Sequence, residues 1–202
     1  MPKETFHNLL PTKQEQILRA AAEEFARQPY ETASLTQIVA VLGIAKGSMY
    51  QYFANKQELY RYVVEQAYAA KKAYLDPVWQ QKLPFFEQVV AYYKATYLFS
   101  REQPLLHQVI HQFWESRDTA VQEDIQSGLA QREADFHRML TEAQATGSIA
   151  GDIEKEAAFF VYHSVGKQLI DDFQQVRHED WHEHLRFIEQ VLRVLQMGLK
   201  AR

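Results

Sequence analysis

Hydrophobic and polar positions alternate along the chain mainly at helical spacing, and the clearest pattern lies between residues 34 and 56. Four apolar side chains in its first part fall on one helical face, at positions Leu35, Ile38, Val39 and Leu42. Ser34 stands just before them with Gln37 three residues later, which is the spacing of a capping box. Gly43 follows at once and can take the left-handed conformation that ends a helix. The pattern predicts a two-turn helix closed by a glycine turn.

A second short helix is predicted from about Ala45 to Phe53, with Met49 and Phe53 on its inner side. Its outer side carries polar and aromatic residues, namely Lys46, Ser48, Tyr50, Gln51 and Tyr52. Asn55 and Glu58 then form the cap of a third helix. Two short helices joined by a glycine turn are typical of a helix-turn-helix, whose second helix enters the major groove of DNA.

The outer side of this second helix carries suitable chemistry for DNA. Gly47 has no side chain, so the backbone can approach a phosphate or a base edge. A cation and hydrogen-bonding groups stand beside it, and no Asp or Glu occurs between Glu31 and Glu58. A glycine-bounded helix pair also occurs as plain helical packing, with the tyrosines partly buried and Lys46 solvated. The caps, the glycines and the acid-free window together favour DNA binding.

The run G-I-A-K-G-S-M-Y-Q-Y-F-A-N-K-Q-E-L, residues 43–59, resembles the recognition-helix signature of the TetR (tetracycline-repressor) family of bacterial transcription regulators. The upstream runs I-L-R-A-A-A-E-E-F and S-L-T-Q-I-V are also similar, so the resemblance covers about residues 12–62. It implies base contacts from Lys46, Gly47, Ser48 and Tyr50, together with Gln51. It implies phosphate contacts from Ser34, Thr36, Tyr50, Tyr52 and Lys56. The family often has Ser where this chain has Ala45, so the second helix lacks a hydroxyl cap.

The whole chain is predicted to be all-α, with about nine helices. A three-helix DNA-binding domain is expected at residues 1–62, with its helix-turn-helix at about 34–53, and a larger helical bundle at 63–202. Residues 1–11 are expected to be a poorly ordered arm. The remaining helices are expected at Lys13–Gln28 (capped by Thr12), Lys56–Leu75 (stopped by Asp76-Pro77), 84–101, 104–116, 118–146, 153–176 (capped by Asp152) and Asp180–Met197 (closed by Gly198).

In the second domain, the last two helices carry broad apolar faces that include the small residues Ala157, Ser164 and Gly166. In similar proteins these helices pair with their symmetry mates, so the resemblance implies a homodimer. A dimer would also place two recognition helices about 34–36 Å apart, in successive major grooves. The middle helices are rich in large aromatic residues, which serve more often as core than as a pocket. By resemblance they would hold a small hydrophobic or aromatic effector, with the candidate pocket residues Tyr93, Tyr97, Phe113, Trp114, Phe136 and Tyr162.

Charge and composition sharpen this picture. The net charge is −4, but residues 1–62 hold seven Lys and Arg against six Asp and Glu, which leaves −5 for the remainder. The chain has no cysteine, which fits a reducing cytoplasm and excludes a disulfide framework or thiolate metal site. It has no apolar run long enough to span a membrane and no apolar signal segment. No cofactor is expected.

Three functional hypotheses follow. The first is a homodimeric repressor of the TetR type that leaves a palindromic operator when a small ligand binds. The second is a DNA-binding regulator without a small-molecule effector, controlled by a protein partner or acting constitutively. The third is an all-α metalloenzyme, because His107 and His111 share a helical face and Glu179-x-x-His182 resembles half of a di-iron site. A second Glu-x-x-His motif is lacking, which counts against the third hypothesis.

Overall fold

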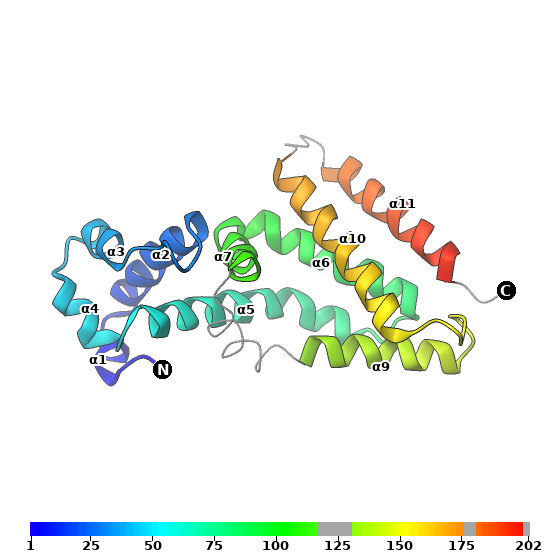
Figure 1. Ribbon diagram of the computed structural model, residues 1–202, viewed down its shortest axis with the longest axis horizontal. Coiled ribbons are helices and arrows are strands. Elements are labelled where there is room, and N and C mark those ends of the chain that lie inside the picture. Colours follow the sequence, from blue (N-terminus) through cyan, green and yellow to red (C-terminus); the bar gives the residue numbers. More distant parts are fainter. Residues whose placement is uncertain (117–130, 176–180, 200–202) are drawn as a thin grey trace. The chain divides into compact units, whose positions relative to one another are not determined.

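The computed structural model describes residues 1–116, 131–175 and 181–199 of the chain. These residues form ten helices and no strand, which confirms the all-α class (Figure 1). The chain divides into two compact units, Met1–Ala73 with Arg101–Gly128 and Tyr74–Ser100 with Leu129–Arg202. No helix in the described part is long and apolar enough to cross a membrane.

The first unit is built on α2, which packs against α3 and α7. Its helices are α1 (Glu4–His7), α2 (Pro11–Arg27), α3 (Leu35–Leu42), α4 (Lys46–Tyr52), the first part of α5 (Lys56–Gln80) and α7 (Pro104–Glu115). The fully buried side chains between them include Ile17, Phe25, Ile38, Met49, Phe53 and Leu59. Met49 and Phe53 therefore face inward as the sequence pattern predicts. This core fixes α3 and α4 as a pair.

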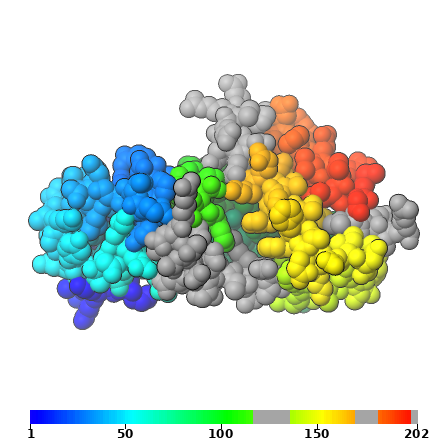
Figure 2. All heavy atoms as spheres, viewed as in Figure 1, coloured from blue at the N-terminus to red at the C-terminus, as the bar shows by residue number. Residues whose placement is uncertain are grey.

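The N-terminal segment differs from the predicted disordered arm. It forms the short helix α1, which lies beside α4 in the same unit (Figures 1 and 2). Phe6 of α1 is fully buried, and its ring packs against the rings of Phe53 and Tyr62. The predicted Thr12 cap is also wrong, since Pro11 opens α2 and its N-cap residue Leu10 makes no side-chain cap. The helix was missed because α1 has only four residues, which are too few to show a helical period.

The second unit contains the end of α5 together with α6 (Phe85–Glu102), α9 (Gln131–Ala145), α10 (Lys155–Gln175) and α11 (Trp181–Leu199). Figure 1 shows α10 and α11 running side by side. The buried core is apolar and rich in aromatic residues; it includes Phe85, Val89, Tyr93, Tyr97, Leu140, Tyr162, Ile188 and Leu192. The division between the units falls inside α5, whose last part contributes Leu75 and Val78 to the second unit, and just before the end of α6.

The predicted stop at Asp76-Pro77 is wrong, because α5 continues through Pro77 to Gln80. Proline lacks the N–H that an interior helix position donates, which normally costs about 3 kcal/mol. Packing on both sides of Pro77 opposes that cost, since Leu75 and Val78 are buried. The buried Gln88 amide of α6 also donates to the Val78 carbonyl at 2.8 Å.

Two other predicted helix ends differ from the structure. Helix α10 begins at Lys155 and is not capped by Asp152, because Ile153 first packs against the core. Helix α11 continues through Gly198 to Leu199, and Gly198 has no positive φ. Gly147 does adopt the left-handed conformation after α9, with φ 72°. The first part of the helix predicted at 118–146 lies outside the described residues, as do Glu179 and Asp180.

Candidate nucleic-acid interface

Local hydrogen bonds define both ends of α3. The Ser34 hydroxyl accepts from the Gln37 backbone N–H at 3.4 Å, which is the predicted cap. The Ser34 backbone N–H donates to the buried Glu24 carboxylate at 2.8 Å, and that carboxylate also accepts from Arg27. Gly43 ends α3 with φ 64°. The cap and the glycine thus set where α3 begins and ends.

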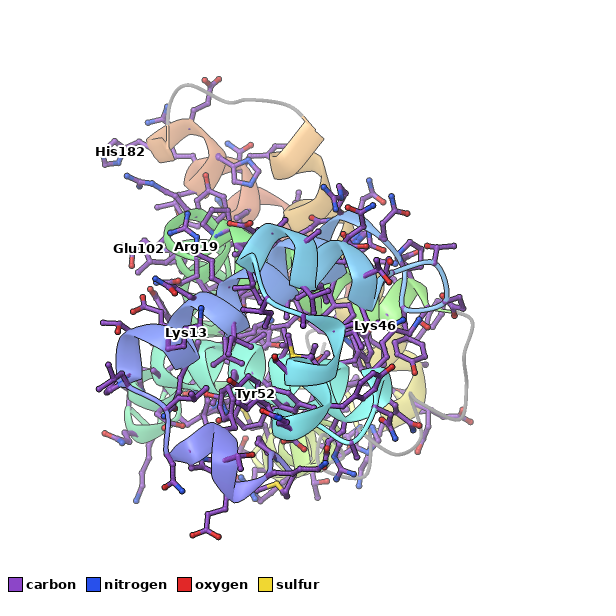
Figure 3. All side chains as sticks on the ribbon, turned by 90° about the vertical axis from the view of Figure 1, so that its left-hand side faces the viewer. Lys13, Arg19, Lys46, Tyr52, Glu102 and His182 are labelled. Carbon is purple, nitrogen blue, oxygen red and sulfur yellow. The ribbon has the colours of Figure 1, made fainter. Side chains whose placement is uncertain are left out.

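Helix α4 presents the predicted polar face to the outside of the first unit. Lys46, Gly47 and Gln51 are exposed, and Ser48 is partly exposed. Tyr50 retains 43% of its side-chain surface. Figure 3 views this face directly, with Lys46 and Tyr52 labelled at the two ends of the helix. Ala45 provides no side-chain cap, in line with its lack of a hydroxyl.

Gly47 has no role in packing within the described residues. A Cβ at this position would meet no atom within 4 Å, and the backbone has no positive φ that would require glycine. Glycine in a helix nevertheless costs about 1 kcal/mol relative to alanine. The protein thus accepts a weaker helix at an exposed position without a gain inside the fold.

The predicted phosphate-contact residues differ in how freely they can reach a ligand. Thr36 is exposed and Ser34 is partly exposed at the start of α3. Tyr52 is half-buried, and its ring meets the Phe6 ring edge-on with 6.3 Å between centroids. Packing thus restrains the Tyr52 ring, whereas Tyr50 is the more exposed tyrosine of the helix.

Lys56 has a role inside the first unit that sequence reasoning missed. Its ammonium group donates to the carbonyls of Tyr30 and Ala33 at 2.7 and 3.1 Å and to that of Glu31 at 3.4 Å. It also lies 4.4 Å from the centre of the Tyr30 ring. The three ammonium protons are engaged with the loop before α3, so a phosphate contact would have to break these bonds.

The cap of α5 follows the prediction and connects to the N-terminus. The Glu58 backbone N–H donates to the Asn55 side chain at 2.8 Å. The Glu58 carboxylate accepts from the Ala54 N–H at 2.5 Å and from the Met1 ammonium at 2.8 Å. Burial tends to raise the pKa of Glu58, but these hydrogen bonds and the nearby positive charges outweigh it and lower that pKa. Glu58 thus ties the first residue of the chain to the start of α5.

The N-terminal model of "Bacterial regulatory proteins, tetR family" matches residues 17–63, which contain α3, α4 and their packing partners. A TetR family transcriptional regulator from Chloroflexus aurantiacus is similar over 100% of both chains, with 27% identity and a TM-score of 0.82. Residues 17–63 thus match the DNA-binding domain of the TetR family of bacterial transcriptional regulators, and the whole chain has the fold of one of its members.

A helix-turn-helix transcriptional regulator of Haemophilus influenzae is 28% identical over 99 residues, which are 49% of this chain and 53% of that protein. The chain thus matches a little over half the length of its curated relatives. The fold of FadR from Bacillus subtilis, solved in complex with stearoyl-CoA, is similar with a TM-score of 0.73 and 18% identity, over 92% of this chain and 98% of that one.

Four of the residues predicted to line a ligand pocket belong to the core of the second unit. Tyr93, Tyr97 and Tyr162 are buried, and Phe136 packs against them. The Tyr93 hydroxyl donates to the Tyr162 carbonyl, and burial raises the pKa of both phenols. These side chains are mainly packing groups of this TetR-family fold.

The other two predicted pocket residues lie on α7 in the first unit. Phe113 is fully buried and meets the Tyr68 ring edge-on, whereas Trp114 is 41% exposed. His107 of the same helix is buried, and its burial, Lys71 and His111 lower its pKa to about 3. In the described residues, no three His, Asp or Glu side chains gather as a metal site.

A small cavity of about 170 Å³ lies in the second unit. Its apolar walls come from α6 and α11, through Val89, Val90 and Leu192. Tyr162 also lines it, and the Tyr162 hydroxyl is a buried group without a hydrogen-bond partner. The lining also holds two charged groups of α11, the Arg193 guanidinium and the Glu189 carboxylate, and Glu189 is paired with Lys94 of α6 at 2.5 Å. Sequence reasoning named Tyr162 here but not the residues of α11, whose periodicity suggested only helix packing.

Proposed function

We propose that this TetR-family protein is a DNA-binding repressor that inserts α4 into the major groove of a palindromic operator. Gly47 is the observation that carries the proposal, because the protein itself gives no reason for a glycine there. The exposed residues Lys46 and Tyr50 on either side supply a cation and a phenol. Base contacts are assigned to Lys46, Gly47, Ser48 and Tyr50 with Gln51, as the family resemblance implies.

Phosphate contacts are assigned to Ser34 and Thr36 at the start of α3 and to Tyr50 on α4. Tyr52 is a weaker candidate because its ring packs against Phe6. We leave Lys56 out of the interface, since its ammonium group is engaged with the loop before α3. The sequence predicts a cytoplasmic location, where a regulator of this kind would meet the chromosome. No catalytic role is proposed.

A homodimer through α10 and α11 is part of the proposal. Both helices leave large apolar side chains exposed, with Phe160 and Val161 on α10 and Phe187, Val194 and Met197 on α11. Contiguous exposed apolar surface commonly marks an interaction site. Two copies would also double the phosphate contacts of a domain with little net charge. Gly166 is not available to this interface, because it packs against Tyr93 inside the unit.

The DNA-binding proposal is tested with a duplex selected by the wild-type chain from random sequence. Binding of wild type, Tyr50→Ala and Tyr50→Phe to that duplex is then measured over a range of salt concentrations. We expect Tyr50→Ala to lose at least about tenfold in affinity and Tyr50→Phe to lose less, because only the hydroxyl contact disappears. Selection of no duplex, or equal binding by all three proteins, would contradict the proposal.

The dimer is tested by sedimentation of Phe160→Glu and Val194→Glu. Each should shift the protein toward monomer, because a buried carboxylate would have no partner in the interface. Val41→Glu serves as the control, because Val41 is equally exposed but lies on α3. Dimers that remain intact in both test variants would contradict the α10 and α11 interface.

The cavity beside Tyr162 supports a small effector. Its volume of about 170 Å³ lies below the roughly 300–1,000 Å³ of pockets for drug-sized ligands, so a compact aromatic acid fits better than a long acyl chain. The Tyr162 hydroxyl and the Arg193 guanidinium would bind its polar end, because the Glu189 carboxylate that also lines the cavity is paired with Lys94. A compact aromatic acid such as benzoate should raise the melting temperature of wild type but not of Arg193→Met, and should weaken DNA binding.

The alternative is a regulator controlled by a protein partner. The close packing of Tyr93, Tyr97 and Phe136 in the second unit favours it, because these residues leave little room for a ligand. No thermal shift with any compact aromatic acid, combined with intact DNA binding, would favour this alternative over the effector.

A further inference from the structure

The carbonyl groups at the C-terminal end of α4 need hydrogen-bond donors from outside the helix. The last four carbonyls of any helix have no donor within the helix itself. In α4 they belong to Met49, Tyr50, Gln51 and Tyr52. The Phe53 N–H donates to the Met49 carbonyl at 2.9 Å. No glycine follows the helix, and Phe53 continues as extended chain, so the common glycine cap is absent here.

The N-terminal segment supplies donors to the three other carbonyls. The Lys3 ammonium donates to the Tyr50 carbonyl at 2.7 Å, and the Thr5 hydroxyl donates to the Gln51 carbonyl. The Lys3 backbone N–H donates to the Tyr52 carbonyl at 2.9 Å. Each carbonyl at the open end of the seven-residue helix α4 therefore has a partner. The Lys3 cation also lies at the negative end of the helix dipole, where it is stabilising.

This segment is held in place at two further points. Phe6 is fully buried, with its ring 5.0 Å from the Phe53 ring and 5.7 Å from the Tyr62 ring between centroids. The Met1 ammonium and the Glu58 carboxylate form an ion pair at 2.8 Å. Residues Met1–His7 thus contact both the C-terminal end of α4 and the start of α5.

We propose that Met1–His7 is a positioning clamp that holds the recognition helix α4 in its DNA-binding geometry. This inference rests on the proposed DNA-binding function. A seven-residue helix is too short to be stable by itself, so its exact orientation depends on tertiary contacts at its ends. Lys3 and Thr5 act as positioning residues through the α4 carbonyls, and neither needs to touch DNA for this effect.

Thr5→Val tests the clamp, because valine keeps the shape of threonine and removes its donor. Thr5→Ser restores a donor and serves as the rescue variant. Thr141→Val is the matched control, since the Thr141 hydroxyl donates to the His137 carbonyl at 2.7 Å on α9 in the other unit. All proteins are full-length, and each is measured with the selected duplex and with a duplex of unrelated sequence.

We expect Thr5→Val to bind the selected duplex about fivefold more weakly than wild type, with an unchanged salt slope and unchanged binding to the unrelated duplex. Without DNA, the amide hydrogens of α4 should exchange faster in Thr5→Val than in wild type or Thr5→Ser. Thr141→Val, a change in the other unit, should alter neither the affinity for the selected duplex nor the amide exchange of α4.

Two outcomes would overturn the clamp. The first is that Thr5→Val behaves like Thr141→Val both in affinity and in the amide exchange of α4. The second is that Lys3→Met lowers the salt slope by about one without faster exchange in α4, which would make Lys3 a phosphate contact and not a positioning residue. If the wild type selects no duplex, the proposed function fails, and the amide exchange of Thr5→Val alone decides the clamp.

Discussion

The ammonium group of Lys56 lies 2.7 Å from the carbonyl oxygen of Tyr30 and 4.4 Å from the centre of the Tyr30 ring. The two residues are separated by 26 positions in the chain. Lys56 therefore holds the start of α5 against the loop that leads into α3. The two lysines of residues 43–59 therefore differ in role. Lys56 stabilises the fold, whereas Lys46 is exposed on α4 and can contact a ligand.

Lys56→Met should destabilise the fold by about 1–3 kcal/mol, because charged hydrogen bonds to carbonyls and a cation–π contact disappear. Its salt slope for DNA binding should equal that of the wild type. Lys46→Met should do the reverse, with little change in the free energy of unfolding and a salt slope lower by about one. Urea unfolding and salt-dependent DNA titrations measure both quantities. Interchanged results for the two lysines would contradict this division.

Gly166 of α10 faces the Tyr93 ring at very close range. A Cβ at Gly166 would lie 2.0 Å from a ring carbon of Tyr93, so the ring or the helix would have to move. Gly166→Ala should cost roughly 1–3 kcal/mol in the free energy of unfolding. Gly151→Ala is the control, because a Cβ there meets nothing within 4 Å. Equal unfolding free energies for the two variants would show that α10 and α6 do not pack in this way.

His107 should make stability depend on pH. Its pKa is lowered from 6.5 to about 3 in the folded state, so between these values the unfolded chain binds more protons than the folded one. Stability from this group is complete above the unfolded pKa and falls as the pH drops below it. Between pH 8 and pH 5 the loss should be about 2 kcal/mol. Urea unfolding of wild type and His107→Leu at both pH values measures it.

The variant His107→Leu should lose less stability than wild type over that interval, because leucine binds no proton. His7→Leu, a change at an exposed histidine of α1, is the control. If the wild type and His107→Leu lose the same free energy of unfolding between pH 8 and pH 5, the burial of a neutral His107 is incorrect.

Features that depend on neighbours in the sequence could be predicted. The caps made by Ser34 and Asn55 and the left-handed Gly43 follow from spacings of a few residues, and the structure has all three. Features that depend on distant neighbours could not be predicted. The burial of Phe6, the partners of Lys56 and the helical position of Pro77 each require contacts that no local pattern encodes.

The candidate interface shows the same limit. The exposed side of α4 was predictable from helical periodicity, because Met49 and Phe53 point inward and fix the orientation of the remaining residues. The aromatic residues of the second unit were not separable into pocket and core, since both have the same spacing. The Tyr93 hydroxyl donates a hydrogen bond and Tyr162 lines a cavity, and both features depend on residues that are distant in the sequence.

The central claim is that DNA approaches the backbone of α4 at Gly47, and Gly47→Ala tests it most directly. Alanine fits the protein, since its Cβ would meet nothing within 4 Å, and it should make the helix more stable by up to about 1 kcal/mol. Gly47→Ala should unfold at the same or a higher urea concentration than wild type, yet bind the selected duplex at least about tenfold more weakly. Undiminished affinity for that duplex would contradict it.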